Sequence, residues 1–252
     1  MILLGAVLGA VFGSFLATAA IRWPREASAL RGRSACDGCG APLTASQLIP
    51  VLSFFLQRGR AVCCGARIDR LHPAGEIAGA LLGAMAVAIG PDIGTVMAGG
   101  LFASLLLLLA LLDARHYWLP DPLNAALALA GVGVGLLGIG PGLSDRLIGG
   151  VAGFLLFAAV RHGYRRLRGR EGMGGGDVKL FGAIGLWLGW QMLPLILFGA
   201  AAAGLFWALI LYAAGRSLNG TSRLPFGVFL ALAAWVGWVA LFWPPLAALA
   251  GR

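Results

Sequence analysis

Long apolar segments alternate with short polar ones along most of the chain. A helix needs about 17 to 25 residues to cross about 30 Å of hydrocarbon, and eight segments approach that length. These predicted membrane spans cover residues 1–21, 74–90, 95–113, 122–140, 144–160, 178–193, 195–214 and 225–244. Pro194 marks the predicted break between the sixth span and the seventh. The pattern predicts an all-α polytopic membrane protein that resides in a lipid bilayer.

The polar segment between the first two spans is much longer than the others. It covers residues 22–73 and contains all four cysteines of the chain. We therefore expect three parts: a first transmembrane helix at 1–21, a small cysteine-containing domain at 22–73 and a transmembrane domain at 74–252.

The composition supports a membrane protein and argues against a nucleic-acid partner. The chain is 60% hydrophobic and 12% charged, against about 25% charged residues in a soluble domain. Its net charge of +9 comes from basic residues that lie between apolar segments and are not interleaved with aromatic residues on one face. Orientation in the membrane explains this charge, and we expect no nucleic-acid binding.

The basic residues are distributed unevenly among the polar segments. Cytoplasmic loops of membrane proteins carry an excess of lysine and arginine. Of the 19 basic residues, all but Arg146 and Arg252 lie in or next to residues 22–73, 114–121, 161–177 and 215–224. These segments are predicted to face the cytoplasm, with the N-terminus outside.

The first apolar segment has two interpretations. The small residues from Ala17 to Ala20 resemble a signal-peptide cleavage site. However, no basic residue precedes the segment, and the first arginine, Arg22, follows it. This order of charge favours a retained helix whose C-terminal end lies in the cytoplasm.

Two aspartates are predicted at similar depth on the cytoplasmic side. Asp113 ends the third span, and Asp177 begins the sixth. Two carboxyl groups a few Å apart share a proton, so that one activates water while the other polarises a carbonyl oxygen. The alternatives are a pair with Arg115 or a hydrated helix end for Asp113, and a pair with Lys179 or a capping role for Asp177. Asp121 is expected to begin or cap the fourth helix.

Three glycines, Gly174, Gly175 and Gly176, precede Asp177 between an arginine-rich segment and an apolar one. Glycine allows the backbone to approach another chain closely, and an ionisable group at membrane depth indicates a functional site. The alternative is a solvated loop whose aspartate caps the next helix.

The cysteines form a second candidate site. Cys36 and Cys39 make a CxxC motif, and Cys63 and Cys64 follow in the same segment. Disulfides are disfavoured in the cytoplasm, so a four-thiolate zinc site is the natural candidate. The adjacency of Cys63 and Cys64 argues against it, because neighbouring residues rarely both reach one tetrahedral ion. The alternative is a set of reduced thiols without metal.

Several stretches of the chain resemble, in order, the type IV prepilin peptidase family. Its members are bifunctional leader peptidases and N-methyltransferases of type IV pilus and type II secretion systems. The similar stretches are Gly13-Ser14-Phe15-Leu16, Arg22-Trp23-Pro24, the segment from Cys36 to Glu76, Asp113 with Leu119-Pro120-Asp121, the GxGD motif Gly174-Gly175-Gly176-Asp177 with Lys179-Leu180, Gly185 to Gln191, and Pro225 to Ala231.

The resemblance implies a specific chemistry. Asp113 and Asp177 would be the catalytic aspartates of an intramembrane aspartyl endopeptidase in a bacterial inner membrane. The enzyme would cleave the leader of prepilins or pseudopilins after a glycine and before a residue that is usually phenylalanine. Gly174 to Gly176, with Lys179, would contact the extended substrate, as a Gly-rich strand can. A second activity would methylate the new α-amino group with S-adenosylmethionine and would depend on the N-terminal cytoplasmic region.

The chain departs from the family's pattern at two positions. Ala17 stands where the family usually has asparagine, and Ala61 stands where the second cysteine pair usually begins. The absence of a cysteine at position 61 argues against a regular zinc site and against a retained methyltransferase activity. The sequence contains no nucleotide-binding fingerprint, so Glu76 and Arg22 are candidates for the methyl-donor site by position alone. A helix-end salt bridge would explain both residues equally well.

Three other functions stay open at this point. One is a prepilin peptidase without methyltransferase activity. A transporter would also place acids at membrane depth, but these acids lie at the cytoplasmic edge, and the chain shows no repeat symmetry. A scaffold would explain the cysteines as a docking module but not the Gly-Gly-Gly-Asp stretch. The sequence indicates neither an oligomeric state nor a particular pilin.

Overall fold

The computed structural model describes residues 1–25, 33–216 and 223–243, and within them the chain is helical, without a β-strand. The predicted fold class is therefore confirmed. Most of the predicted loop at 215–224, the end of the last span at residue 244 and Arg252 lie outside the described residues. The chain divides into two compact units, Met1–Gly90 and Pro91–Arg252.

Each of the eight predicted spans corresponds to a helix. These helices are α1 (Ile2–Arg22), α3 (Leu71–Ile89), α4 (Ile93–His116), α5 (Asp121–Leu136), α6 (Leu143–Arg168), α7 (Gly175–Leu188), α8 (Leu193–Ala213) and α9 (Phe226–Phe242). The short helix α2 (Leu52–Leu56) lies in the cysteine-containing segment. In the described part of the chain, five helices are long and apolar enough to cross a membrane: α1, α3, α4, α6 and α8, while α5 and α9 are shorter apolar helices. This is a multi-pass membrane protein.

The predicted break at Pro194 is wrong. The sixth helix, α7, already ends at Leu188, because Gly189 adopts φ 77° and ψ 169°, a conformation that suits only glycine. A single 3₁₀ turn, Trp190–Met192, follows before α8 begins. Pro194 lies in the first turn of α8, where its missing N–H costs no helical hydrogen bond.

The last turns of α6 differ from the prediction too. The helix continues past the predicted end at residue 160 to Arg168, and Gly169 with φ 66° follows it. Arginine is a good helix former, and its charge near the C-terminus is favoured by the helix dipole. Hydropathy locates the apolar part of a helix but not its polar extension.

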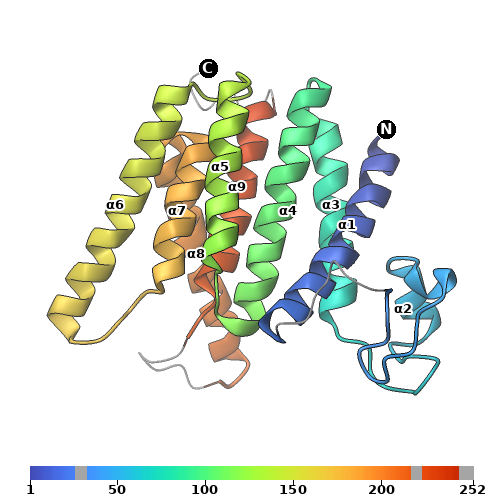
Figure 1. The fold of residues 1–252 in the computed structure, drawn as a ribbon. Coiled ribbons are helices and arrows are strands. Elements are labelled where there is room, and N and C mark those ends of the chain that lie inside the picture. The colour runs from blue at the N-terminus through green and yellow to red at the C-terminus, as the bar shows by residue number, and fades with distance from the viewer. Residues whose placement is uncertain (26–32, 217–222, 244–252) are drawn as a thin grey trace. The chain divides into compact units, whose positions relative to one another are not determined.

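In the first unit, α1 and α3 pack antiparallel through glycines (Figure 1). A Cβ atom on Gly9 would collide with the carbonyl oxygen of Gly79, and one on Gly13 with that of Gly75. The glycines recur at every fourth position in both helices: Gly5, Gly9 and Gly13 in α1, and Gly75, Gly79 and Gly83 in α3. Small residues at this spacing let helix backbones touch in lipid.

Aromatic rings form the core of the second unit. The Trp187 ring of α7 stacks on Phe102 of α4 with centroids 4.4 Å apart, and it meets Trp238 of α9 edge-on at 5.8 Å. The indole N–H of Trp187 donates to the carbonyl oxygen of Leu127 in α5 at 2.7 Å. Figure 1 shows α5, α6 and α7 side by side within this unit. The Trp187 side chain thus connects α7 to α4 and α9 through its ring, and to α5 through its indole N–H.

Arg146 is a fully buried cation in the first turn of α6. Its side chain is 0% exposed and donates to four carbonyl oxygens, those of Gly131, Ile139, Pro141 and Leu186. These acceptors belong to α5, the α5–α6 connection and α7. A guanidinium has five N–H donors, so one side chain can satisfy several helix-end carbonyls at once. The charge pattern placed Arg146 outside the cytoplasm, but it did not predict this role.

Candidate active site

Asp113 is held against the start of α9. It lies one turn before the end of α4, its side chain is buried with 5% exposure, and its Oδ2 accepts from the Val228 backbone N–H at 3.2 Å. A Cβ on Gly227 would lie 2.9 Å from the same oxygen, so glycine is required there. Tyr117, with φ 52°, ends α4 and donates its N–H to the Asp113 carbonyl at 2.9 Å.

Asp177 is the third residue of α7 and is also buried, with 9% exposure. Its carboxylate accepts a hydrogen bond from the backbone N–H of Gly174, the residue that precedes the helix. The capping role considered for Asp177 is therefore present, as expected for a carboxylate in a first helical turn. A cap explains the orientation of this side chain but does not require it to be buried.

The lysine considered as an alternative partner of Asp177 pairs elsewhere. Lys179 Nζ lies 2.6 Å from Asp121 Oδ2, and both side chains are well exposed. Asp121 is the first residue of α5, as predicted, and Pro120 precedes it. This ion pair links the starts of α5 and α7 and leaves the Asp177 carboxylate free of a lysine partner.

The two buried carboxyl groups lie in one site. They are close enough for their charges to interact. The Leu119 side chain lies between the starts of α7 and α9, because a Cβ on Gly176 would be 2.7 Å from Leu119 Cβ and one on Gly227 would be 3.0 Å from Leu119 Cδ1. The starts of α7 and α9 thus converge on the end of α4, as the predicted dyad requires.

The predicted Gly-rich strand is not formed. Gly174 is extended, but Gly175 and Gly176 already belong to the first turn of α7. The reason is the hydrogen bond between Asp177 and the Gly174 amide, which favours helix at this point. Gly176 is needed for the close approach of Leu119.

One buried polar residue near the site escaped sequence analysis. Asn124 in α5 is 3% exposed, and its amide donates to the Leu119 carbonyl at 3.4 Å. It thereby holds the residue that separates α7 from α9. An asparagine in an otherwise apolar helix, one turn after Asp121, was the available signal.

The structure brings all four cysteines together. Their sulfur atoms lie within 4.8 Å of one another, with Cys36–Cys64 at 3.8 Å, Cys39–Cys63 at 3.3 Å and Cys63–Cys64 at 3.9 Å. A tetrahedral zinc with Zn–S bonds of about 2.3 Å requires sulfurs about 3.8 Å apart. The donor set and its spacing fit such an ion, and the adjacency of Cys63 and Cys64 does not prevent both from reaching the cluster.

Two similar turns present these thiols. In the first, the Gly40 N–H donates to the Cys36 carbonyl at 2.8 Å, and in the second the Gly65 N–H donates to the Ala61 carbonyl at 2.7 Å. Both glycines have φ near 70° (73° and 71°). Ala61 therefore occupies in the second turn the place that Cys36 occupies in the first, and Cys63 supplies the fourth sulfur instead.

The thiols differ in their tendency to ionise. Backbone amides of Gly38 and Cys39 lower the pKa of Cys36 to about 7. The pKa of Cys63 is raised to about 12, first by its hydrogen bond with the Cys39 thiol and then by that with Cys36. The Cys36 thiol therefore ionises more readily than the Cys63 thiol, and its negative charge disfavours ionisation of a second thiol nearby. A bound cation would offset this repulsion between thiolates.

Arg22 and Glu76, the candidates for the donor site by position, have different partners. Arg22 ends α1 and pairs with Asp37 at 3.7 Å. Asp37 also lies 3.2 Å from His72, whose hydrogen bond is the main cause of the lowered pKa of this carboxyl. Glu76 accepts hydrogen bonds from the Ser14 hydroxyl and the Val51 N–H.

Comparison with known proteins gives two adjacent family matches. Residues 100–209 match the type IV leader peptidase family, and residues 7–89 match the bacterial peptidase A24 N-terminal domain. A prepilin leader peptidase/N-methyltransferase of Aeromonas hydrophila is 39% identical over 212 residues, which cover 84% of this chain and 71% of the relative. The chain belongs to the type IV leader peptidase family. No solved structure matches the chain.

Other relatives of this leader peptidase carry the same name. The protein of Pseudomonas putida is 35% identical over 270 residues, covering 96% of this chain and 90% of the relative. That of Burkholderia pseudomallei is 41% identical over 200 residues, covering 79% of this chain and 64% of the relative. The N-terminal match falls within the first unit, and the peptidase match, which includes Asp113 and Asp177, falls within the second.

Proposed function

We propose that this leader peptidase is an intramembrane aspartyl endopeptidase whose catalytic residues are Asp113 and Asp177. It cleaves the leader of type IV prepilins or pseudopilins after a glycine and methylates the new N-terminal residue with S-adenosylmethionine. The observation that carries the proposal is the convergence of two buried carboxyl groups from different helices, α4 and α7. Membership of the family supports both activities, because its relatives are named for both.

The chemistry follows from the pair. One ionised carboxyl takes a proton from water as the water oxygen attacks the scissile carbonyl carbon. The other, protonated, carboxyl donates a hydrogen bond to the carbonyl oxygen as negative charge develops there. Collapse of the tetrahedral intermediate breaks the C–N bond, and the departing amine receives a proton from the pair. The Val228 N–H holds one Asp113 oxygen and so orients that carboxyl throughout.

The substrate contacts are proposed around the start of α7. Gly174, Gly175 and Gly176 lack side chains beside Asp177, so a peptide backbone can approach there. Lys179 lies at the exposed edge of this region with Asp121 as its partner. The uneven distribution of basic residues supports an active site on the cytoplasmic side of a bacterial inner membrane, with the N-terminus outside. In this arrangement residues 1–21, 22–73 and 74–252 act as anchor, cytoplasmic domain and peptidase domain.

The cysteine cluster is proposed as a structural zinc site. Cys36, Cys39, Cys63 and Cys64 would supply four thiolates, and closed four-thiolate sites stabilise small segments by linking them. Asp37 lies next to the first ligand and contacts both Arg22 and His72. Asp37 thus links the first cysteine turn to α1 through Arg22 and to α3 through His72.

The other functions considered have less support. A transporter or a scaffold does not account for the paired buried carboxyl groups together with the family match. A peptidase without methyltransferase activity would require the changed cysteine spacing to disable the N-terminal unit, whereas the four sulfurs still meet.

Purified protein in liposomes tests the proposal directly. A prepilin with its leader is incubated with the protein and with S-adenosylmethionine that carries a labelled methyl group, and the products are analysed by mass spectrometry. We expect a single cut after a glycine and one labelled methyl group on the new N-terminus. An uncut prepilin would refute the peptidase, and a cut product without label would refute the methyltransferase alone.

Metal content tests the ligand set. We expect about one zinc per chain in the wild type and a loss of most of it in Cys63→Ser. Because Ala61 occupies the place equivalent to Cys36, adding Ala61→Cys to Cys63→Ser should restore binding through the CxxC spacing. Elemental analysis of the purified variants measures this. Full zinc in Cys63→Ser would exclude Cys63 as a ligand.

A further inference from the structure

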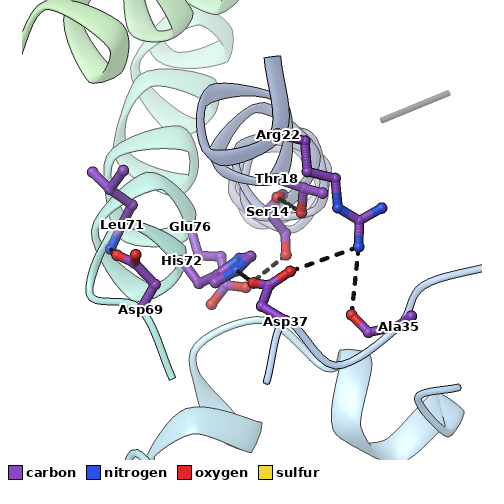
Figure 2. Close-up of polar contacts among 9 residues, drawn as sticks. All are labelled: Ser14, Thr18, Arg22, Ala35, Asp37, Asp69, Leu71, His72 and Glu76. Carbon is purple, nitrogen blue, oxygen red and sulfur yellow. Dashed lines mark hydrogen bonds and ion pairs between the residues drawn. The ribbon is translucent and has the colours of Figure 1, made fainter. Parts of the chain in front are cut away.

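The first unit contains a cavity of about 1040 Å³ that the peptidase chemistry does not use. It is lined by α1, by α3 and by the segment between them. Figure 2 shows the polar side chains at this place: Ser14 and Arg22 come from α1, Glu76 and His72 from α3, and Asp37 from the first cysteine turn. All of them lie within the unit Met1–Gly90.

Glu76 is the most unusual of these residues. It is 6% exposed, its Oε1 accepts from the Ser14 hydroxyl at 2.6 Å and its Oε2 accepts from the Val51 N–H at 2.7 Å. In the described part of the chain, both hydrogen-bond donors to this carboxylate are neutral groups. Each carboxylate oxygen has a second lone pair, so Glu76 can accept further hydrogen bonds or face a cation. A buried anion without a counter-charge is costly, and a cationic ligand would offset that cost.

The rest of the cavity has different chemistry. Arg22 lies two turns after Ser14 in α1 and also lines the cavity, where its Nη2 is 3.7 Å from Asp37 Oδ1 and 3.4 Å from the Ala35 carbonyl oxygen. Six further arginines line the cavity, and so do the apolar side chains of Val11, Phe15 and Phe54. The arginines are Arg25, Arg33, Arg58, Arg60, Arg67 and Arg70. The site therefore offers a buried anion, many cations and an apolar wall.

We propose that this cavity binds the methyl donor S-adenosylmethionine, with its sulfonium beside Glu76 and its carboxylate on the arginines. The donor carries a sulfonium cation, an α-carboxylate and a flat purine, which match the three kinds of lining. The inference rests on the proposed methyltransferase function and names its donor site. Glu76 acts in it as a binding residue for the sulfonium.

The transfer itself explains why an anion is suited to this position. The lone pair of the unprotonated α-amine attacks the methyl carbon, the C–S bond breaks and its electron pair stays on sulfur. The amine then loses a proton to solvent, and the sulfonium has become a neutral thioether. The attraction to Glu76 disappears in that step, so the donor binds more tightly than its product, S-adenosylhomocysteine.

This difference gives the decisive measurement. Glu76→Gln keeps the shape and one acceptor oxygen, replaces the other oxygen with an NH2 group and removes the charge. In calorimetry with the full-length protein in detergent, we expect the affinity for S-adenosylmethionine to fall about 10-fold or more. The affinity for the neutral S-adenosylhomocysteine should fall no more than about threefold. Asp69→Asn removes a charge from the same cavity lining and is the matched control, which should leave the ratio of the two affinities unchanged.

Three results would be informative. An unchanged preference for the donor in Glu76→Gln would overturn the proposal, as would an equal loss of both ligands. A wild type that cleaves prepilin but neither methylates it nor binds the donor would refute the methyltransferase function itself. Prepilin cleavage by Glu76→Gln, expected at wild-type rate, shows that the variant is folded.

A second measurement avoids substitution altogether. Ultraviolet cross-linking of methyl-labelled S-adenosylmethionine to the wild type, followed by peptide mapping, should label residues within 11–25 or 33–76. Label confined to peptides of the second unit would place the donor elsewhere and overturn the proposal.

Discussion

Replacing Asp113 or Asp177 with asparagine is expected to abolish leader cleavage, with a fall of about 10³-fold or more for either variant. Asparagine has nearly the same shape and can accept the hydrogen bonds from Val228 or Gly174, so the fold is preserved. It cannot take up a proton from water, and it cannot serve as the protonated partner of an ionised carboxyl. Single-turnover cleavage of a prepilin in liposomes measures the loss.

The control for this prediction is Asp121→Asn. Asp121 lies on the same side of the fold, in the exposed pair with Lys179, and its substitution should change the cleavage rate only a few-fold. The binding of S-adenosylmethionine should be retained in all three variants, because the proposed donor cavity lies in the first unit. If Asp113→Asn and Asp177→Asn both cleave at the wild-type rate, the dyad is not catalytic.

Arg146→Ala is expected to destabilise the second unit strongly, by about 3–5 kcal/mol. The substitution leaves four carbonyl oxygens, in α5, in the α5–α6 connection and in α7, without their donor. For a unit of this size, the loss corresponds to a fall of roughly 10 °C in Tm. Thermal unfolding in detergent, followed by tryptophan fluorescence, measures it.

Two further variants separate the geometry from the charge. Arg146→Lys keeps the charge but has a single donor group, so it should recover only part of the stability. Arg166→Ala removes an exposed arginine from the same helix and should leave Tm within about 2 °C of the wild type. A Tm of Arg146→Ala equal to that of Arg166→Ala would show that the carbonyl contacts contribute nothing.

The approximate positions of the helices and the common depth of the two buried aspartates were predictable, because each depends on a property averaged over a long stretch of sequence. Hydropathy over a whole span locates a helix, and the distribution of arginine places Asp113 and Asp177 at one depth. Boundaries depend on single residues. Proline at 194 is tolerated in a first turn, whereas Gly189 adopts a conformation that only its backbone angles reveal. Nothing in the pattern distinguishes it from the other glycines of the chain.

The roles of residues whose contacts come from several distant segments of the chain were not predictable. Arg146 looks like a loop cation in the sequence, and its role depends on carbonyl oxygens that come together only in the fold. Asn124 acts through Leu119, which has no chemistry of its own. At the cysteines, the sequence indicated a disturbed site because of Ala61, whereas the turn geometry lets Cys63 reach the cluster.

The glycine contacts between α1 and α3 also affect how the cysteine segment becomes ordered. Residues 23–70 connect two antiparallel helices whose backbones touch, so the two ends of this segment are already held together. The conformational entropy of closing so long a loop is therefore lost when the helices associate and not when the cysteines meet. A metal ion then has only the two local turns to order. Separating α1 from α3, for example with Gly9→Leu, would lower zinc affinity without altering any thiol.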